Sequence, residues 1–171
     1  YYFEQCSDNF AKITGEPVAY WVSEKVRDAF ANNPMIDDVL ETRNGMSTTN
    51  NNLFLRCWFE ISLLKCGLGD FTRQSAKQSQ RKWFRYNKGG EFRRWFGNND
   101  YVVNWENDGE YLKSYVAERY GSYSKEIRSE DRYFDESITW SGVTSSQTGF
   151  RYSPQGAIFD SGANGLFAQK A

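Results

Sequence analysis

The sequence predicts an α+β fold, with one mixed domain built on a twisted, largely antiparallel β-sheet and several short helices. With 171 residues, the chain is long enough for one domain with a hydrophobic core and short for two. Its composition, 39% apolar, 25% charged and 18% aromatic, is typical of a folded globular protein. Helix and strand patterns are mixed without the regular alternation of a parallel β-α-β array.

The first half of the chain contains two expected helices. One is predicted over 23–33, "SEKVRDAFANN", where Ser23 can cap the N-terminus and Val26 and Phe30 share a face. A short polar helix is expected over 72–80. Between them we expect a strand near 39–42, a long polar loop over 43–52, and a strand rich in Phe, Leu and Trp.

The second half predicts a buried strand, a longer helix and a group of short strands. The strand is "DYVVNWEN", and Asp108 can cap a helix that continues to Tyr120. Tyr111, Leu112, Tyr115 and Val116 have the spacing of a buried helical face. The alternation of apolar and polar residues over 136–168, with Gly, Ser and Pro turns, predicts three or four strands.

Several classes of chemistry are excluded by residue content. The chain has no histidine, so it holds no Ser-His-Asp triad, Cys-His pair or histidine general base. Cys6, Cys57 and Cys66 show no C-x-x-C spacing, so we expect no metal site. Three reduced thiols are favoured over a Cys57–Cys66 disulfide. Neighbouring acids, Asp37 with Asp38 and Glu130 with Asp131, are interpreted as solvated surface rather than as catalytic pairs.

No apolar run is long enough to span a bilayer, and no secretion signal is visible at the start. We therefore expect a soluble cytoplasmic protein with no membrane partner. The chain begins at Tyr1 and stops at "LFAQKA", which suggests a domain excised from a longer protein.

Basic residues are concentrated in one segment. Between Phe71 and Asn99 there are eight Lys or Arg and one acid, Glu91, whereas the whole chain has a net charge of −1. The core of this segment, "KWFRYNKGGEFRRWFGNND" (82–100), interleaves cations with aromatic residues around a Gly-Gly pair. Cations neutralise phosphates, rings stack on exposed bases, and glycines allow close backbone approach, so this pattern favours a polyanion such as nucleic acid.

The same segment has a structural interpretation. Its aromatic residues can form core while the cations solvate an outer face; those residues are Trp83, Phe84, Phe92, Trp95 and Phe96. The loop "RNGMSTTNNN" (43–52) is also open to two interpretations. Asn, Ser and Thr can bind base edges, or Asn and Gly can simply supply the left-handed conformations of a surface turn.

Four blocks of the sequence resemble one family. They are "GEPVAYWVSEKV", "RNGMSTTNNNLFLRCWFE", "KWFRYNKGGEFRRWFGNNDYVVNWENDG" and "ITWSGVTSSQTGFRYSPQGAIFD". Together they resemble the region after the catalytic domain in large adenine-specific DNA methyltransferases of the PglX type, from BREX phage-defence systems, and in type IIG restriction-modification relatives. The matching positions are Tyr20, Trp21, Gly45, Thr48, Asn51, Phe54, Arg56, Lys82, Trp83, Tyr86 to Gly90, and Ile138 to Ser141. Thr49 occupies a position where the family has glycine.

The resemblance implies that residues 1–171 form a DNA target-recognition domain of a restriction-modification or BREX protein. The N-P-P-Y motif and the S-adenosylmethionine-binding glycines of the family's catalytic domain are missing, since the nearest string is "NNPM" at 32–35. The fragment itself is therefore expected to have no catalytic residue and no cofactor, while the parent enzyme would use S-adenosylmethionine. Expected partners are double-stranded DNA, the catalytic domain, and other defence proteins or a phage inhibitor.

The resemblance also implies roles for particular residues. Phosphate contacts would come from the cations around the Gly-Gly pair. Base reading would come first from Thr48, Asn50, Asn51 and Asn52, and second from the polar segment Ser145, Ser146 and Gln147. The expected DNA-binding residues are Thr48, Thr49, Asn50, Asn51, Asn52, Arg56, Lys82, Arg85, Asn87, Lys88, Gly89, Gly90, Arg93, Arg94, Ser145, Ser146 and Gln147.

Two other classes remain open. A single-stranded nucleic-acid binder would stack bases on exposed rings, and a protein-interaction module would use the same surface for another protein. A carbohydrate-binding module is disfavoured, because a neutral glycan does not need a basic segment.

Overall fold

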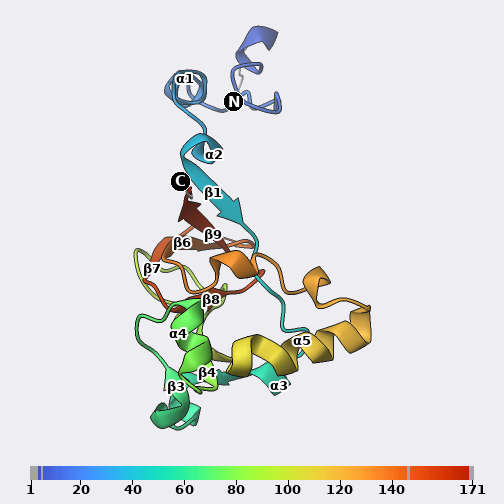
Figure 1. Cartoon of the computed structure of the whole chain (residues 1–171). Helices are drawn as coiled ribbons and strands as arrows, with labels where there is room; N and C mark the ends of the chain where they lie inside the picture. The colour runs from blue at the N-terminus through green and yellow to red at the C-terminus, as the bar shows by residue number, and fades with distance from the viewer. Residues whose placement is uncertain (1–3, 5, 146, 170–171) are drawn as a thin grey trace. The chain divides into compact units, whose positions relative to one another are not determined.

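The computed structural model describes residues 4, 6–145 and 147–169. The chain divides into two compact units, Tyr1–Glu41 and Thr42–Ala171, and each is described by itself (Figure 1). The α+β class is confirmed, because short helices are combined with mainly antiparallel strand pairs. No helix among the described residues is long and apolar enough to cross a membrane.

Among its described residues, the smaller unit has three helical elements before Leu40. These are the 3-10 helix η1 (Ser7–Asn9), α1 (Glu24–Asn32) and the short α2 (Ile36–Val39). The predicted helix over 23–33 is confirmed as α1, although the Ser23 side chain makes no capping hydrogen bond. Val26 and Phe30 are exposed on this helix, whereas Arg27 is buried and donates to the Val22 carbonyl at 2.6 Å.

The first sheet has the strand order β1-β9-β6-β7 and contains the polar C-terminal strands. β6 (Ser137–Ser141) pairs antiparallel with both β7 (Phe150–Ser153) and β9 (Ala163–Ala168). β1 (Leu40–Arg43), whose last two residues belong to the larger unit, lies at the edge next to β9. Buried and exposed residues alternate along β6 and β7, so one face of these strands is covered and the other meets solvent.

The second sheet lies entirely in the larger unit and carries the basic segment. Its order is β2 (Leu55–Cys57), β5 (Tyr101–Asn104), β4 (Trp83–Asn87) and β3 (Cys66–Gly67). β8 (Ala157–Phe159) also pairs with β4, parallel to it and beyond the end of β3. The sheet is mixed, because β3 and β8 run parallel to β4 whereas β5 pairs antiparallel with both β2 and β4. β4 is central and its neighbours bury four of its five residues.

The larger unit also contains three α-helices: α3 (Asn51–Phe54), α4 (Arg73–Gln78) and α5 (Glu106–Tyr120). Its 3-10 turns are η2 (Trp58–Glu60), η3 (Leu63–Lys65), η4 (Tyr123–Lys125) and η5 (Glu130–Arg132). The main core joins these helices to both sheets and includes Phe54, Phe84, Trp105, Leu112, Tyr133 and Phe167. α4 confirms the predicted polar helix over 72–80, and Thr72 caps it by accepting from the Ser75 amide.

The start of α5 differs from the prediction. Asp108 does not cap the helix: Trp105 is at the N-cap, and Asn107, Asp108 and Gly109 have left-handed backbone angles. The Asp108 carboxylate instead binds the side chains of Arg73 and Lys113. On the predicted apolar face Leu112 and Val116 are buried, but Tyr111 is 54% exposed.

All three cysteines are described and none forms a disulfide. Cys6 is exposed, Cys57 is half-buried and Cys66 is buried. The prediction of three free thiols is therefore confirmed, and the Cys57–Cys66 disulfide is not formed.

Candidate nucleic-acid interface

The part of the basic segment that forms β4 is largely buried. Trp83, Phe84, Tyr86 and Asn87 of β4 are buried, so the structural interpretation of the first two aromatic residues is correct. The Asn87 side-chain amide donates to Ser153 Oγ at 2.6 Å. Asn87, proposed above for DNA binding, therefore has its donor occupied inside the larger unit.

Arg85 also points into the protein. Its guanidinium donates to the carbonyls of Gln155 and Gly69, and it lies 3.7 Å from the carboxylate of Asp70. Burial lowers the pKa of Arg85, with the nearby carboxylate acting in the opposite direction. A phosphate would have to compete with three protein acceptors for this side chain.

Two further cations of the segment have carboxylate partners. Lys82 Nζ lies 3.8 Å from Glu106 Oε2 and 5.9 Å from the centre of the Trp83 ring. Lys88 Nζ lies 3.5 Å from Asp160 Oδ2. Acids from other parts of the chain therefore compensate much of the positive charge that is concentrated in the sequence.

The two glycines of "YNKGG" fit against neighbouring parts of the chain. A Cβ on Gly89 would lie 2.4 Å from the Gly162 carbonyl oxygen. The Gly90 amide donates to Ser141 Oγ at 3.1 Å, and the same hydroxyl donates to the Gly90 carbonyl at 3.0 Å. Gly89 and Gly90 thus allow the chain after β4 to pass close to the first sheet. This packing explains why glycines occupy both positions, and it does not require a bound phosphate.

Residues 91–96, which we name the arginine–aromatic loop, follow this turn and face solvent. Arg93 and Arg94 are exposed, as are Phe92, Trp95 and Phe96. For these three rings the structural interpretation as core is wrong, because the chain turns away from β4 before it reaches them. The segment therefore has a buried first half and an exposed second half.

Arg94 connects the arginine–aromatic loop to the polar segment that contains Ser145 and Gln147. Its guanidinium donates to Gln147 Oε1 at 3.3 Å. Ser145 and Gln147 are exposed, and Ser146 lies outside the described residues. Two groups of expected DNA-binding residues from distant parts of the sequence are thus brought together.

A small cavity adjoins the base of the same loop. It has a volume of about 220 Å³ and is lined by Lys88, Gly89, Gly90, Glu91, Arg93, Asn98, Asp100 and Tyr101. Its lining contains both cations and acids, and the Asn98 side-chain amide donates to the Glu91 carbonyl at 3.1 Å. The cavity size suits a water cluster or a small polar group rather than a nucleotide.

The amide-rich loop is used for local structure. Asn50 caps α3 by accepting from the Leu53 amide and also donates to the Tyr115 hydroxyl at 3.0 Å. Thr48 is buried and donates to Asn51 Oδ1 at 2.6 Å. Thr49 has a φ of 56°, a left-handed conformation that glycine would adopt without strain.

Asn52 lies in the first turn of α3, and Arg56 follows the helix in β2. Asn52 and Asn51 are exposed, whereas the Arg56 guanidinium donates to the Asn52 carbonyl at 2.7 Å and lies 5.8 Å from the centre of the Trp83 ring. Of the residues 48–52, the exposed Asn51 and Asn52 side chains are thus best placed to meet a ligand.

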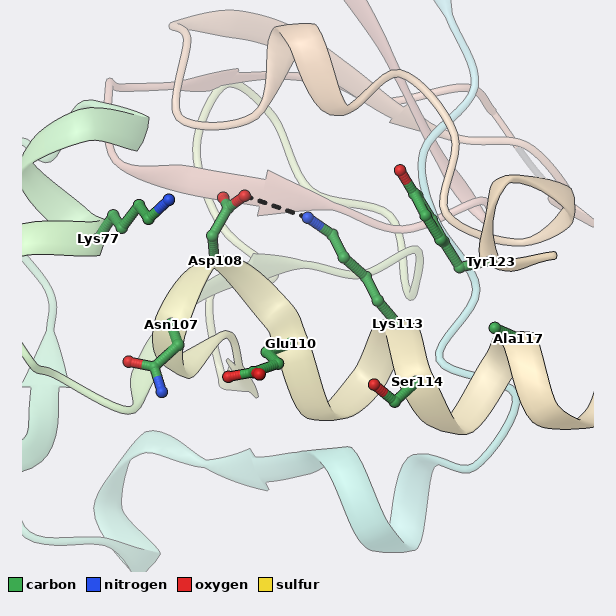
Figure 2. A pocket seen from close by; sticks show the side chains of 8 residues that line it. All are labelled: Lys77, Asn107, Asp108, Glu110, Lys113, Ser114, Ala117 and Tyr123. Atoms are coloured by element: carbon green, nitrogen blue, oxygen red, sulfur yellow. Dashed lines mark hydrogen bonds and ion pairs between the residues drawn. The ribbon is translucent and has the colours of Figure 1, made fainter.

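A larger cavity, which the sequence did not predict, lies along α5 (Figure 2). Its volume is about 670 Å³, and it is lined by Lys77, Asn107, Asp108, Glu110, Lys113, Ser114, Ala117 and Tyr123. Lys113 Nζ contacts Asp108 at 3.1 Å and also pairs with Glu130. Arg73 binds the same two carboxylates, so four charges form one network beside the cavity.

This network does not form an acid-base pair. Burial opposes ionisation of Asp108, but hydrogen bonds from Arg73 and Lys113 outweigh it and lower the pKa of the carboxyl group. Asp108 is therefore ionised and paired at neutral pH. No group of three or more His, Cys, Asp or Glu side chains among the described residues has the arrangement of a metal site.

The acid pairs noted in the sequence also have structural uses. Asp38 accepts from the Met35 amide at 2.8 Å and so caps α2. Glu130 belongs to the charge network, and Asp131 lies 3.9 Å from the Arg43 guanidinium. Each of these three acids has a structural partner, which favours the interpretation that they are not catalytic.

Comparison with known proteins shows that the chain is homologous to one segment of two adenine-specific methyltransferases. It is 38% identical over 169 residues to the adenine-specific methyltransferase PglX of Lacticaseibacillus casei (strain Zhang) and 36% identical over 165 residues to the adenine-specific methyltransferase BrxX of Escherichia coli O9:H4 (strain HS). These matches cover 98% and 95% of this chain but only 14% and 12% of the two relatives. No family model matches the chain.

Proposed function

We propose that this chain is the DNA target-recognition part of an adenine-specific DNA methyltransferase of the BREX type or of a restriction-modification system. It would hold a duplex site so that a catalytic domain elsewhere in the parent protein, using S-adenosylmethionine, can methylate an adenine. The chain itself would bind no cofactor and catalyse no reaction, and the parent protein would act in the cytoplasm.

One observation carries the proposal beyond homology. Arg93 and Arg94 project from a loop that is fixed against the first sheet, and Arg94 contacts Gln147 of a second exposed polar segment. Neither arginine has a carboxylate partner among the described residues, in contrast to Arg73, Lys82 and Lys88. Guanidinium groups without a carboxylate partner are the side chains best suited to bidentate phosphate contact.

The remaining expected DNA-binding residues divide by accessibility. Asn51, Asn52, Ser145 and Gln147 are exposed and would read base edges in the major groove. Four others would act by positioning the loop: Arg85, Asn87, Gly89 and Gly90. The side chains of Arg85 and Asn87 and the backbone of Gly90 make hydrogen bonds within the protein, and Gly89 packs too closely against Gly162 for a side chain. Lys82 and Lys88 would contact phosphate only by giving up their carboxylate partners.

The proposal is tested by titrating the chain with duplex DNA over a series of salt concentrations. Arg93→Ala and Arg94→Ala, singly and together, should weaken binding similarly on all sequences. The slope of log K against log salt should become shallower by about 0.9 for each phosphate that the variant no longer neutralises. Lys77→Ala is the matched control, because Lys77 is an exposed cation of the same segment that lines the α5 cavity instead. It should leave the slope unchanged.

Two outcomes would count against the proposal. Absence of duplex binding at low salt would remove the chain from DNA recognition and favour a protein-interaction role, such as contact with other defence proteins or a phage inhibitor. An equal weakening by Lys77→Ala and by the two arginine variants would mean that binding depends on net charge and not on this loop.

A further inference from the structure

The arginine–aromatic loop exposes three large rings next to its two arginines. The exposed fraction is 46% for Phe92, 71% for Trp95 and 60% for Phe96. Burying a ring of this size is favourable by about 1.5–3 kcal/mol, so a cluster of exposed rings is typical of a binding surface. Phosphate contact alone does not require any of them.

The backbone that carries these rings is fixed by the first sheet. Ser141 Oγ holds both polar groups of Gly90, and the Tyr152 amide donates to the Trp95 carbonyl at 2.7 Å. Gly149 packs against the Arg93 carbonyl so closely that a Cβ would lie 2.4 Å from its oxygen. The loop is therefore anchored before, within and beside the ring cluster, and little ordering entropy would be lost when a ligand binds.

Charge and ring faces are combined at the same place. The Arg94 guanidinium carbon lies 4.9 Å from the centre of the Phe92 ring and 5.9 Å from that of Trp95. An acidic peptide would use the cations but not the ring faces, and a fully paired duplex keeps its base faces stacked inside. An unpaired nucleotide offers both a phosphate and a free π-face.

We propose that Trp95 stacks on an unpaired nucleobase within duplex DNA, while Arg93 and Arg94 contact the phosphates beside it. This rests on the proposed duplex binding and adds to it a preference for a locally unpaired site. Stacking accepts the face of any base, so the preference would depend on pairing state and not on base identity.

The experiment measures the affinity of the chain for three probes of equal length: a paired duplex, the same duplex with one unpaired adenine, and the single strand. The wild-type chain should bind the duplex with the unpaired adenine about 10-fold more tightly than the paired duplex. Trp95→Ala should abolish this preference but keep the affinity and the salt slope for the paired duplex. Trp95→Phe should retain most of the preference, because it keeps an aromatic face.

Trp58→Ala is the matched control, since Trp58 is 43% exposed and lies in η2 outside the loop. It should leave the preference unchanged. The thermal midpoint of each variant shows that it is folded, and Phe96→Ala provides a second test of the same ring cluster, with a reduced preference expected.

The outcomes separate this inference from the proposed function. If the paired duplex binds but the wild-type chain shows no preference for the unpaired adenine, the stacking inference is wrong and duplex binding stands. The same holds if Trp95→Ala weakens both duplexes equally or neither, which would assign the rings to another contact such as a protein surface. If no duplex binds, the proposed function itself fails.

Discussion

The Tyr86 hydroxyl donates to Asp160 Oδ2 at 2.7 Å, and this buried pair joins β4 to the turn after β8. The same hydroxyl contacts the Met46 carbonyl, and the same carboxylate pairs with Lys88. The string "YNKGG" thus begins at a structural connection among three segments of the larger unit. The integrity of this connection decides whether the exposed loop that follows has a defined position.

Tyr86→Phe removes the hydroxyl at the centre of this connection. We expect a loss of about 1–3 kcal/mol in the free energy of unfolding, because the buried Asp160 carboxylate oxygen loses its hydroxyl donor. Urea denaturation measures this. Tyr152→Phe is the control: its hydroxyl binds Glu136 at 3.0 Å on an exposed side chain, so the change should be small. Equal losses in the two variants would contradict the structural role of Tyr86.

The two glycines after this tyrosine should differ in their response to alanine. Gly89→Ala brings a Cβ to 2.4 Å from the backbone oxygen of Gly162, which cannot yield without moving the chain, whereas Gly90→Ala meets only the Asn98 side chain at 3.3 Å. We expect a loss of about 1–3 kcal/mol for Gly89→Ala and a smaller one for Gly90→Ala. Thermal midpoints of both variants test this order, and the reverse order would refute the packing role of Gly89.

Thr49→Gly should stabilise the protein. Thr49 is β-branched with a φ of 56°, and its buried hydroxyl has no hydrogen-bond partner among the described residues. Releasing the strain and removing the hydroxyl should raise the free energy of unfolding by about 1 kcal/mol. Thr48→Gly is the counterpart and should destabilise, since the buried Thr48 hydroxyl binds Asn51 at 2.6 Å. A lower thermal midpoint for Thr49→Gly would contradict the argument.

Stability should fall at alkaline pH. Burial raises the pKa of Tyr86 and Tyr133 above the ordinary value of 10.0, so the unfolded chain releases these protons first. The stabilisation is present below that value and decreases as the pH rises above it, by about 1.4 kcal/mol per pH unit for each tyrosine. Denaturant midpoints between about pH 8 and about pH 11 measure the decrease. If stability decreases with pH as steeply in Tyr86→Phe as in the wild type, Tyr86 does not contribute to the alkaline loss of stability.

Stability should also fall at acidic pH through the charge network beside α5. The pKa of Asp108 is below its ordinary value of 3.8, so its contribution is present above that value and is lost as the pH falls through the lower value in the folded protein. Urea midpoints between about pH 5 and about pH 2 should decline less steeply for Asp108→Asn than for the wild type. Parallel curves for the two proteins would show that Asp108 does not contribute.

The sequence predicts the positions of helices and strands better than it predicts which charged side chains lack a partner within the protein. α1, α4, β5 and the C-terminal strands β6 to β9 lie where local pattern placed them, because capping residues, turns and alternation act over short distances. Arg85 and Lys88 were interpreted as free cations, but their partners Gln155 and Asp160 are about 70 residues away. No local pattern in the sequence indicates such pairing. The net charge counted along the segment is therefore larger than the positive charge that it leaves unpaired in the folded protein.

The amide-rich loop contains a helix-capping signal at Asn50 that neither interpretation of the loop uses. Asn50 precedes Asn51–Phe54 as an N-cap should, and it accepts from the Leu53 amide three residues later. By contrast, nothing local distinguishes the buried Trp83 from the exposed Trp95, since both follow a cation in aromatic surroundings. Their difference depends on where β4 ends, which is decided by its pairing with β5 and β8.

The attachment of the arginine–aromatic loop to the first sheet bears on how the loop could be exchanged between relatives. Its fixed points, Ser141, Gly149 and Tyr152, lie some 50 residues further along the chain. Exchanging residues 91–96 alone between relatives would place a foreign loop on unmatched supports. The smallest transferable unit is therefore discontinuous, and a chimaera that keeps the loop in its position should move 90–97 together with 141–152.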